Sequence, residues 1–280
     1  MWIAFKTIVI KEILRFSRIW VQTIVPPVIT TSLYLLIFGG LMGSRIGQMR
    51  GIDYLDFIVP GIILMTVIMQ SYANTVSSFF MTKYNNSFEE LLVSTTPNWV
   101  ILLGFVSGGI SRGLCVGAAV TFTISFFVEI QIHSLLIIAV TFFLTSIMFA
   151  LAGFINAVYA KTFDDISIIP NFVLLPLTYL SGMFYCIDIL PSFWQNLSAF
   201  NPIFYMMDSF RLGFLGVSSV DLWKAFLIPG VMIIVLIMYP GFKSAFSDVI
   251  GYFYISSKAN ELLNTLLIDK NIRMDNLQPS

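Results

Sequence analysis

Residues that could carry out chemistry are few in this sequence, and their spacing does not match that of catalytic or metal sites. The two cysteines, Cys115 and Cys186, show no CxxC spacing, and His133 is the single histidine. We therefore predict no disulfide framework, no metal site and no histidine-based proton relay. GxxxxGK[ST] and HExxH motifs are absent from the sequence, so no ATP site is expected in this chain, and we expect no catalytic residues.

An acidic pair, Asp164–Asp165, lies in the polar stretch KTFDD at 161–165. Asp165 directly precedes an apolar run. A carboxylate at that position can cap a helix, because the helix dipole favours negative charge at its N-terminus. We expect Asp165 to cap the helix that follows, and we do not expect the pair to take part in catalysis.

A second polar stretch, KYNNSFEELLVSTTPN at 83–98, has the features of a short surface helix. Asn86 or Ser87 can cap its start, two glutamates follow in its first turn, and Pro97 can end it. Its leucines and valine form an apolar side that no lipid contact requires. We interpret the segment as a docking element for another protein; a plain connector is the alternative.

The rest of the sequence is dominated by apolar residues, which make up 58% of the 280 residues, whereas 11% are charged and the mean hydropathy is +0.89. Soluble domains carry about 25% charged residues, so we expect this chain in a bilayer. Helices are the predicted elements because open strands leave backbone groups unpaired in lipid. The prediction is an all-α membrane protein with six transmembrane helices. The apolar stretches long enough to span are 22–43, 57–82, 99–128, 134–159, 166–185 and 222–239.

Lysine and arginine gather on one side of these spans, which predicts a cytoplasmic location for both termini. The inner segments then hold Lys6, Lys11, Arg15, Arg18, Lys83, Lys161, Lys243, Lys258, Lys270 and Arg273. The outer loops hold Arg45, Arg50 and Arg211. The formal net charge of the whole chain is zero, so no nucleic-acid partner is expected.

Residues 4–20 precede the first span and are predicted to form an amphipathic helix that lies in the membrane surface. Its apolar residues recur at Phe5, Val9, Ile13, Phe16 and Trp20. Lys11, Arg15 and Arg18 form a basic face that could contact anionic headgroups or an acidic partner. The alternative is a flank that only sets the topology.

One basic residue, Arg112, falls inside the predicted span 99–128. A charge at the bilayer centre is costly, whereas one near a helix end can reach the interface. Arg112 is therefore either a structural residue or a contact with substrate or another subunit. Small residues that share helical faces predict close packing here, and these are Gly104, Gly108, Gly109, Gly113 and Gly117.

The longest outer segment, 186–221, is rich in apolar residues and is interrupted by two prolines. We expect it to form a re-entrant hairpin of short helices between the fifth and sixth spans, because irregular backbone at that depth must be buried in protein or face water. Met183, Phe184 and Tyr185 precede it and could line a path or a dimer interface. Ordinary interfacial aromatics are the alternative.

Two other function classes have less support. A secondary transporter is expected to carry internal repeats and ionisable groups inside its spans, and no predicted span has an acidic residue in its middle. A membrane-embedded enzyme such as a lipid transferase needs a cluster of polar catalytic groups near the interface. The sequence offers none, so transport is the favoured class.

Six stretches carry a resemblance to a known family: RIWVQTIVPPVIT (18–30), DFIVPGI (56–62), SFEELLVSTTP (87–97), AKTFDDISIIPNFVLLPLTYLSGMFY (160–185), LPSFWQNLSAFNPIFYM (190–206) and FRLGFLG (210–216). With them, the sequence resembles the ABC-2 family of exporter permeases, most closely the YadH-type inner-membrane permeases. The likeness runs from about residue 5 to residue 230 and is strongest at 160–216.

The resemblance implies the transmembrane subunit of an ATP-binding cassette exporter, which moves an amphipathic, lipid- or drug-like substrate outward. It implies that a separate ATP-binding subunit hydrolyses ATP, so this chain is expected to be no enzyme and to hold no cofactor, with ATP and Mg on the partner. A second permease subunit, forming a homodimer, and membrane lipids are the other implied partners, in the bacterial inner membrane.

The resemblance also implies roles for particular segments. The N-terminal amphipathic helix would be the interface helix, and 186–221 would be the outer hairpin. The segment near 85–97 would be the coupling helix. The residues that would contact the ATP-binding subunit are Ser87, Phe88, Glu89, Glu90, Leu91 and Leu92.

The expected domain organisation is an ABC-2 type transmembrane domain at 1–240 and a polar cytoplasmic tail at 241–280. The apolar run stops at Tyr239, and the tail has no match in the family pattern. We expect the tail to be either an added helix, at about 259–268, or the product of a reading-frame change.

Overall fold

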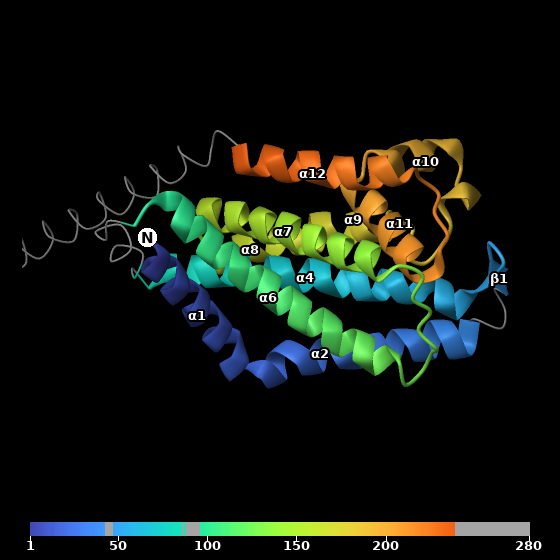
Figure 1. Ribbon diagram of the computed structural model, residues 1–280, viewed down its shortest axis with the longest axis horizontal. Helices are drawn as coiled ribbons and strands as arrows, with labels where there is room; N and C mark the ends of the chain where they lie inside the picture. Colours follow the sequence, from blue (N-terminus) through green and yellow to red (C-terminus); the bar gives the residue numbers. More distant parts are fainter. Residues whose placement is uncertain (43–46, 86, 88–95, 239–280) are drawn as a thin grey trace, which may run out of the picture.

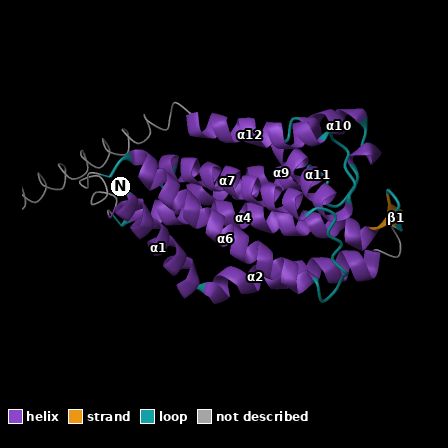
Figure 2. Ribbon diagram, viewed as in Figure 1, coloured by secondary structure: helices purple, strands orange, loops and turns teal. Residues whose placement is uncertain are grey.

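The computed structural model describes residues 1–42, 47–85, 87 and 96–238 of the chain. In these ranges the protein is a bundle of long helices with short helices gathered at one end (Figure 1). One two-stranded ribbon is the only β-structure in the described ranges (Figure 2). The all-α prediction is therefore confirmed.

The elements follow one another in a simple order. The N-terminal part holds α1 (Trp2–Arg18), α2 (Trp20–Tyr34), the π-helix η1 (Leu35–Met42) and the strands β1 (Gln48–Met49) and β2 (Ile52–Asp53). The central helices are α4 (Tyr54–Tyr84), α6 (Asn98–Ile124) and α7 (Leu135–Tyr159). The remaining elements are α8 (Phe163–Ile169), the π-helix η2 (Pro170–Leu174), α9 (Leu175–Tyr179), the 3₁₀ helix η3 (Ile187–Ile189), α10 (Ser192–Ala199), α11 (Pro202–Leu215) and α12 (Leu222–Met238).

Within the described residues, four helices are long and apolar enough to cross a membrane, namely Trp20–Gly39, Tyr54–Tyr84, Asn98–Ile124 and Leu135–Tyr159. They coincide with the first four predicted spans. The fifth predicted span falls on the run α8–η2–α9, which also contains Pro176. The helix type changes at Pro170, because proline has no backbone N–H to donate to the helical hydrogen bonds. The sixth falls on α12, an apolar helix of 17 residues at the lower limit for a span.

Helix α4 is the centre of the bundle and packs against α6, α7 and α11. In the most apolar stretch of α4, 67% of the residues are buried, whereas in that of the first span, which begins with α2, 17% are buried. Phe79 of α4 packs against Phe105 of α6 and Phe154 of α7, with ring centroids 5.3 and 4.4 Å apart. Figure 1 shows α2 and α12 on opposite sides of these central helices.

Glycines allow the central helices to approach closely, as the sequence predicted. A Cβ placed on Gly109 of α6 would lie 2.1 Å from Thr75 Oγ1 of α4, and one on Gly113 would lie 2.0 Å from Ser71 Oγ. Without a hydrophobic driving force between helices in lipid, such close van der Waals contact is what holds them together.

The end of the bundle that holds β1 and β2 is called the hairpin end below. Arg50 and Gly51 join the two strands with φ angles of 53° and 78°, the positive values of a type I′ turn. Arg50 forms an ion pair with Asp188 of η3, which ties the turn to the C-terminal half of the chain. The Arg50 guanidinium holds the pKa of Asp188 below its usual range.

Asp165 takes part in the helix cap, as predicted, but the helix begins earlier: Thr162 is the N-cap residue and Asp165 is the third residue of α8. Asp165 Oδ2 accepts hydrogen bonds from the backbone N–H groups of Lys161 (2.8 Å) and Thr162 (2.9 Å), and Thr162 Oγ1 accepts one from the N–H of Asp165. The bonds between Thr162 and Asp165 form a reciprocal capping box, and the bond from Lys161 satisfies a third backbone donor. The same N–H groups hold the pKa of Asp165 below its usual range.

The contact between α4 and α7 generates a test. A Cβ on Gly153 of α7 would lie 2.6 Å from the backbone carbonyl oxygen of Tyr72, which cannot rotate away. We expect Gly153→Ala to lower the free energy of unfolding by about 1–3 kcal/mol, as overpacking does. The measurement is the temperature of half-loss of the monodisperse peak in detergent. Gly230→Ala is the matched control, because nothing lies within 4 Å of its Cβ position; equal losses would contradict the packing account.

Candidate functional site

Most of the predicted docking segment lies outside the described residues. That part holds Phe88, Glu89, Glu90, Leu91 and Leu92. Ser87 is described and is a half-buried residue in helical conformation. Apart from Ser87, the described chain ends at Asn85, directly after α4, and resumes at Thr96, just before α6. The segment therefore joins two helices that pack along each other.

The end of α4 beside this segment is fixed to α7 by Lys83. Its Nζ donates hydrogen bonds to the carbonyl oxygens of Val158 (3.0 Å) and Ala160 (2.6 Å). These carbonyls lie at the C-terminus of α7, where backbone acceptors lack partners within the helix and attract a cation. Any displacement of the end of α4 is therefore shared with α7.

Helix α1 is packed on protein along one face. Its buried residues are Ile8, Glu12 and Phe16. Positions for a Cβ on Gly104 and Gly108 of α6 lie 2.5 Å from Ile8 Cγ2 and 2.6 Å from Glu12 Cβ, so α1 lies directly against the glycines. The buried face of α1 is thus rotated about the helix axis from the predicted apolar face. The helix buries the side that fits against the α6 glycines, because this close packing sets its orientation.

The predicted basic face of α1 is divided by this packing. Lys11 and Arg18 are exposed. Arg15 instead turns inward, where its Nη2 donates to Asn74 Oδ1 (2.8 Å) and lies 3.3 Å from Glu12 Oε2. Sequence periodicity missed Glu12 because a carboxylate in an amphipathic helix is normally expected on the exposed side.

A groove of about 230 Å³ lies between α2 and α4. Its lining combines apolar groups with hydroxyl and amide groups, and includes Pro26, Pro27, Thr30 and Tyr34 of α2 and Met65, Thr66 and Gln70 of α4. The volume is slightly below the range of about 300–1,000 Å³ common for ligand pockets. The mixture of groups suits one end of an amphipathic molecule.

Arg112 forms a hydrogen bond with a residue that lines this groove. Its Nε donates to Oε1 of Gln70, at 3.0 Å, and Gln70 lines the groove. Arg112 is half-buried and connects α6 to α4 at this level. The contact gives Arg112 a structural partner and places its charge behind a polar group of the groove.

The three residues predicted at a path or dimer interface have different environments. Met183 is fully buried and packs against Gly61 of α4. Phe184 stacks on Phe38 with ring centroids 4.8 Å apart, and its ring lies 5.9 Å from that of Tyr34. Tyr185 is half-buried. Because Tyr34 also lines the groove, Phe184 is the member of this set that lies beside it.

Arg211 was placed in an outer loop from the sequence, and the structure buries it in α11. Its Nη2 donates to the carbonyl oxygen of Gly182, at 2.8 Å, and its Cζ lies 3.9 Å from the centre of the Phe57 ring. Gly182 has φ 77°, a value that favours glycine. Arg211 therefore joins α11 to α4 and to the turn after α9.

Asp208, one turn before Arg211 in α11, was not singled out from the sequence. It is 1% exposed, and its carboxylate accepts hydrogen bonds from Ser218 Oγ (2.6 Å) and from the backbone N–H groups of Ser219 (2.9 Å) and Val220 (3.0 Å). These bonds fold the connection between α11 and α12 onto α11. No local sequence signal identifies them, because the donors come from a loop.

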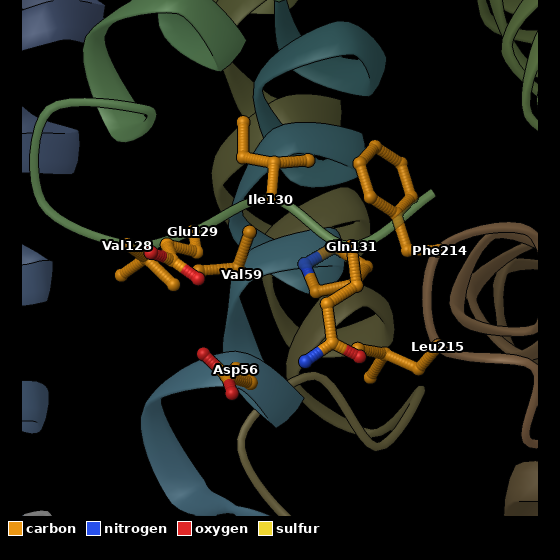
Figure 3. Close-up of a pocket in the computed structure, with 9 residues that line it drawn as sticks. Asp56, Val59, Val128, Glu129, Ile130, Gln131, Phe214 and Leu215 are labelled. Atoms are coloured by element: carbon orange, nitrogen blue, oxygen red, sulfur yellow. The ribbon is translucent and has the colours of Figure 1, made fainter. Parts of the chain in front are cut away.

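A second, much smaller cavity lies at the hairpin end. Figure 3 shows Asp56 of α4, Glu129 and Gln131 of the loop after α6, and Leu215 of α11 around it. Its volume of about 10 Å³ has room for about one water molecule. Among the described residues, no group of three His, Cys, Asp or Glu side chains is gathered as a metal site requires.

Comparison with known proteins confirms the resemblance seen in the sequence. A family model described as ABC-2 type transporter matches residues 3–215. The chain is 55% identical over 238 residues to the inner membrane transport permease YadH of Escherichia coli strain K12, which covers 85% of this chain and 92% of that protein. It is 24% identical over 190 residues to nodulation protein J of Rhizobium leguminosarum bv. trifolii, which covers 68% of this chain and 72% of that protein.

The Asp208 contacts generate a second test. Asp208→Ala leaves two backbone donors and one hydroxyl without their acceptor, and each unsatisfied buried group costs about 1–3 kcal/mol. We expect a clear loss of thermal stability in detergent and faster proteolysis of the 216–221 connection. Asp221→Ala is the control, since Asp221 is exposed and only pairs with Lys224 at the surface. Unchanged proteolysis of the Asp208 variant would contradict the role of this carboxylate.

Proposed function

The chain belongs to the ABC-2 type transporter family, and from this premise we propose that it moves an amphipathic, lipid- or drug-like substrate outward across the bacterial inner membrane. It is a transport permease, not an enzyme, and the family pairs such permeases with an ATP-binding ABC subunit. The name of YadH as an inner membrane permease supports the location.

The groove between α2 and α4 is the observation that carries the proposal of an amphipathic substrate. Its methionines and prolines can contact an apolar chain, while Thr30, Thr66 and Gln70 offer partners for a polar group. The span that begins with α2 packs on α6 but is mostly exposed, so the groove opens beside a helix whose outer side is free of protein contacts in the described residues. A substrate dissolved in the membrane could reach it without crossing water.

We place the transport path along this groove. Gln70, with Arg112 behind it, forms one end, and Tyr34 with Phe184 lies toward the other. The stacking of Phe184 on Phe38 fits a resting state in which that end is closed. Met183 and Tyr185 act in this proposal by supporting the turn that carries Phe184.

We propose six spans with both termini in the cytoplasm. The broken run α8–η2–α9 is the fifth span, α12 is the sixth, and α10 and α11 form the outer re-entrant hairpin between them. The gathering of short helices at the hairpin end supports this arrangement (Figure 1). The 1–240 region is then the ABC-2 domain, and 241–280 is a cytoplasmic tail that lies outside the described residues.

A second copy of the permease is proposed to cover part of α2. Val25 and Ile29 are exposed and lie four residues apart, so they form one apolar stripe on the first half of that helix. In a homodimer this stripe would face the equivalent helix or the lipid beside it. Lys11 and Arg18 on the exposed side of α1 would contact anionic headgroups at the membrane surface.

The segment 85–97 is proposed as the coupling helix. Ser87, Phe88, Glu89, Glu90, Leu91 and Leu92 would contact the ATP-binding subunit. The support is its position between α4 and α6, since α4 is the most buried helix of the bundle and any push on its end reaches α6, α7 and α11.

The proposed partner can be tested directly. Affinity purification of the chain from its native membrane in mild detergent is expected to recover an ATP-binding subunit in equimolar amount. The purified permease alone is expected to hydrolyse no ATP. Recovery of the permease without any ATPase, or ATP turnover by the pure chain, would contradict the division of labour between two subunits.

A separate experiment tests the proposed coupling helix. Reversing both charges in Glu89→Lys/Glu90→Lys is expected to reduce recovery of the ATP-binding subunit at least tenfold, because in this proposal the two glutamates pair with basic groups of the partner and two lysines would repel those groups. Membrane insertion should be unchanged. Asp221→Lys is the control, since Asp221 precedes α12 and the chain there lies at the hairpin end. Full recovery by the double variant would remove these glutamates from the contact.

A further inference from the structure

Glu12 of α1 is a fully buried carboxylate, with 0% of its surface exposed. Burial of a carboxylate is costly unless hydrogen bonds and opposite charge compensate for the lost water. Ser78 Oγ of α4 donates to Glu12 Oε1 at 2.6 Å, and Arg15 Nη2 lies 3.3 Å from Glu12 Oε2. Both carboxylate oxygens therefore have a partner, and one partner belongs to a different helix.

Arg15 extends this contact along α4. The same Nη2 donates to the side-chain oxygen of Asn74 (2.8 Å) and to its backbone carbonyl oxygen (3.1 Å). Asn74 and Ser78 are four residues apart, so they lie on one face of α4. Glu12 and Arg15, three residues apart on α1, thus hold two successive turns of α4. We call these four residues the α1–α4 clamp.

The opposite side of Glu12 is closed by α6. A Cβ on Gly108 would lie 2.6 Å from Glu12 Cβ, and one on Gly104 would lie 2.5 Å from Ile8. Any larger residue at Gly108 would push α1 away from α6. The carboxylate is therefore held by hydrogen bonds on one side and by close packing on the other.

The next helix is not held in this way. Ile19, with φ −108° and ψ 32°, interrupts the chain between α1 and α2. Beyond it, the groove of about 230 Å³ separates α2 from α4. Figure 1 shows α1 and α2 meeting at an angle. The chain thus passes from a clamped helix to one that packs on α6 but is separated from α4 by the groove, with a single non-helical residue between them.

We infer that Glu12 is a positioning residue that makes α1 and α4 one rigid unit, so that a movement of α4 is delivered at Ile19 to the start of α2. The inference rests on the proposed function, in which the ATP-binding subunit acts on the segment that follows α4. Glu12 itself touches no substrate. It fixes the point from which α2 opens or closes the groove.

Distances between spin labels test the rigid unit. Thr7→Cys on α1 and Met81→Cys on α4 are exposed reporters for the clamp, and Leu33→Cys reports on α2. The background carries Cys115→Ser, and Cys186 is buried and escapes labelling. The permease and its ATP-binding subunit are compared in nanodiscs without nucleotide and after trapping with ATP and vanadate. We expect the 7–81 distance to stay narrow and unchanged, and the 33–81 distance to shift.

Ser78→Ala removes the donor to Glu12 and leaves the contacts of Arg15 in place, and Glu12→Ala removes the carboxylate that both Ser78 and Arg15 bind. Both are expected to broaden the 7–81 distance distribution and to reduce the nucleotide-driven 33–81 shift, the second more strongly. Ser77→Ala is the matched control, because Ser77 Oγ donates to carbonyl oxygens of its own helix. It should leave both distances as in the unmodified protein.

Two results would overturn the inference: a 7–81 distance that changes with nucleotide as much as the 33–81 distance, or a Ser78→Ala distribution identical to that of Ser77→Ala. Failure of the proposed function gives a different pattern, in which no ATP-binding subunit assembles and neither distance responds to nucleotide. The comparison of Ser78→Ala with Ser77→Ala in the free permease still decides the role of the clamp in that case.

Discussion

Inside a membrane, a polar side chain must find its hydrogen-bond partner within the protein, and α4 is the helix on which the rest of the bundle meets this constraint. Two of its hydroxyl groups are satisfied locally, since Thr75 and Thr82 donate to carbonyl oxygens four residues earlier. Asn74 and Ser78 instead take side-chain partners from α1. Polar groups that bond across helices therefore set the position of α1 against α4, whereas those that bond within their own helix do not.

The same constraint explains why several charged residues of the bundle form hydrogen bonds between one helix and another element. Arg15, Arg112 and Arg211 each bind a polar group on a different element, and Lys83 binds the last carbonyls of α7. A guanidinium or ammonium group buried without such a partner would be too costly to keep. These cations join the elements at several levels of the bundle, and the glycines of α6 and α7 allow the helices between them to pack closely.

A transporter needs parts that stay together and parts that separate, and the packing divides the chain in this way. The helices α4, α6 and α7 share most of the buried surface, while α2 and α12 lie at the sides with their apolar residues largely exposed. The groove lies at the boundary between the first group and α2. Movement of α2 would change the groove without breaking the contacts of Phe79 or the close approach at Gly153, because neither involves α2.

The sequence by itself determined the class of protein, the positions of four long helices, the cap at Asp165 and the glycine faces of α6, because hydropathy, helix caps and small-residue spacing are local signals. Its family resemblance determined the role of permease. Only the tertiary structure decided that Glu12 is buried, that Arg15 turns inward and that Arg211 lies in the core. These outcomes depend on partners distant in the chain, Ser78, Asn74 and Gly182, and periodicity along one helix carries no information about the surface against which that helix packs.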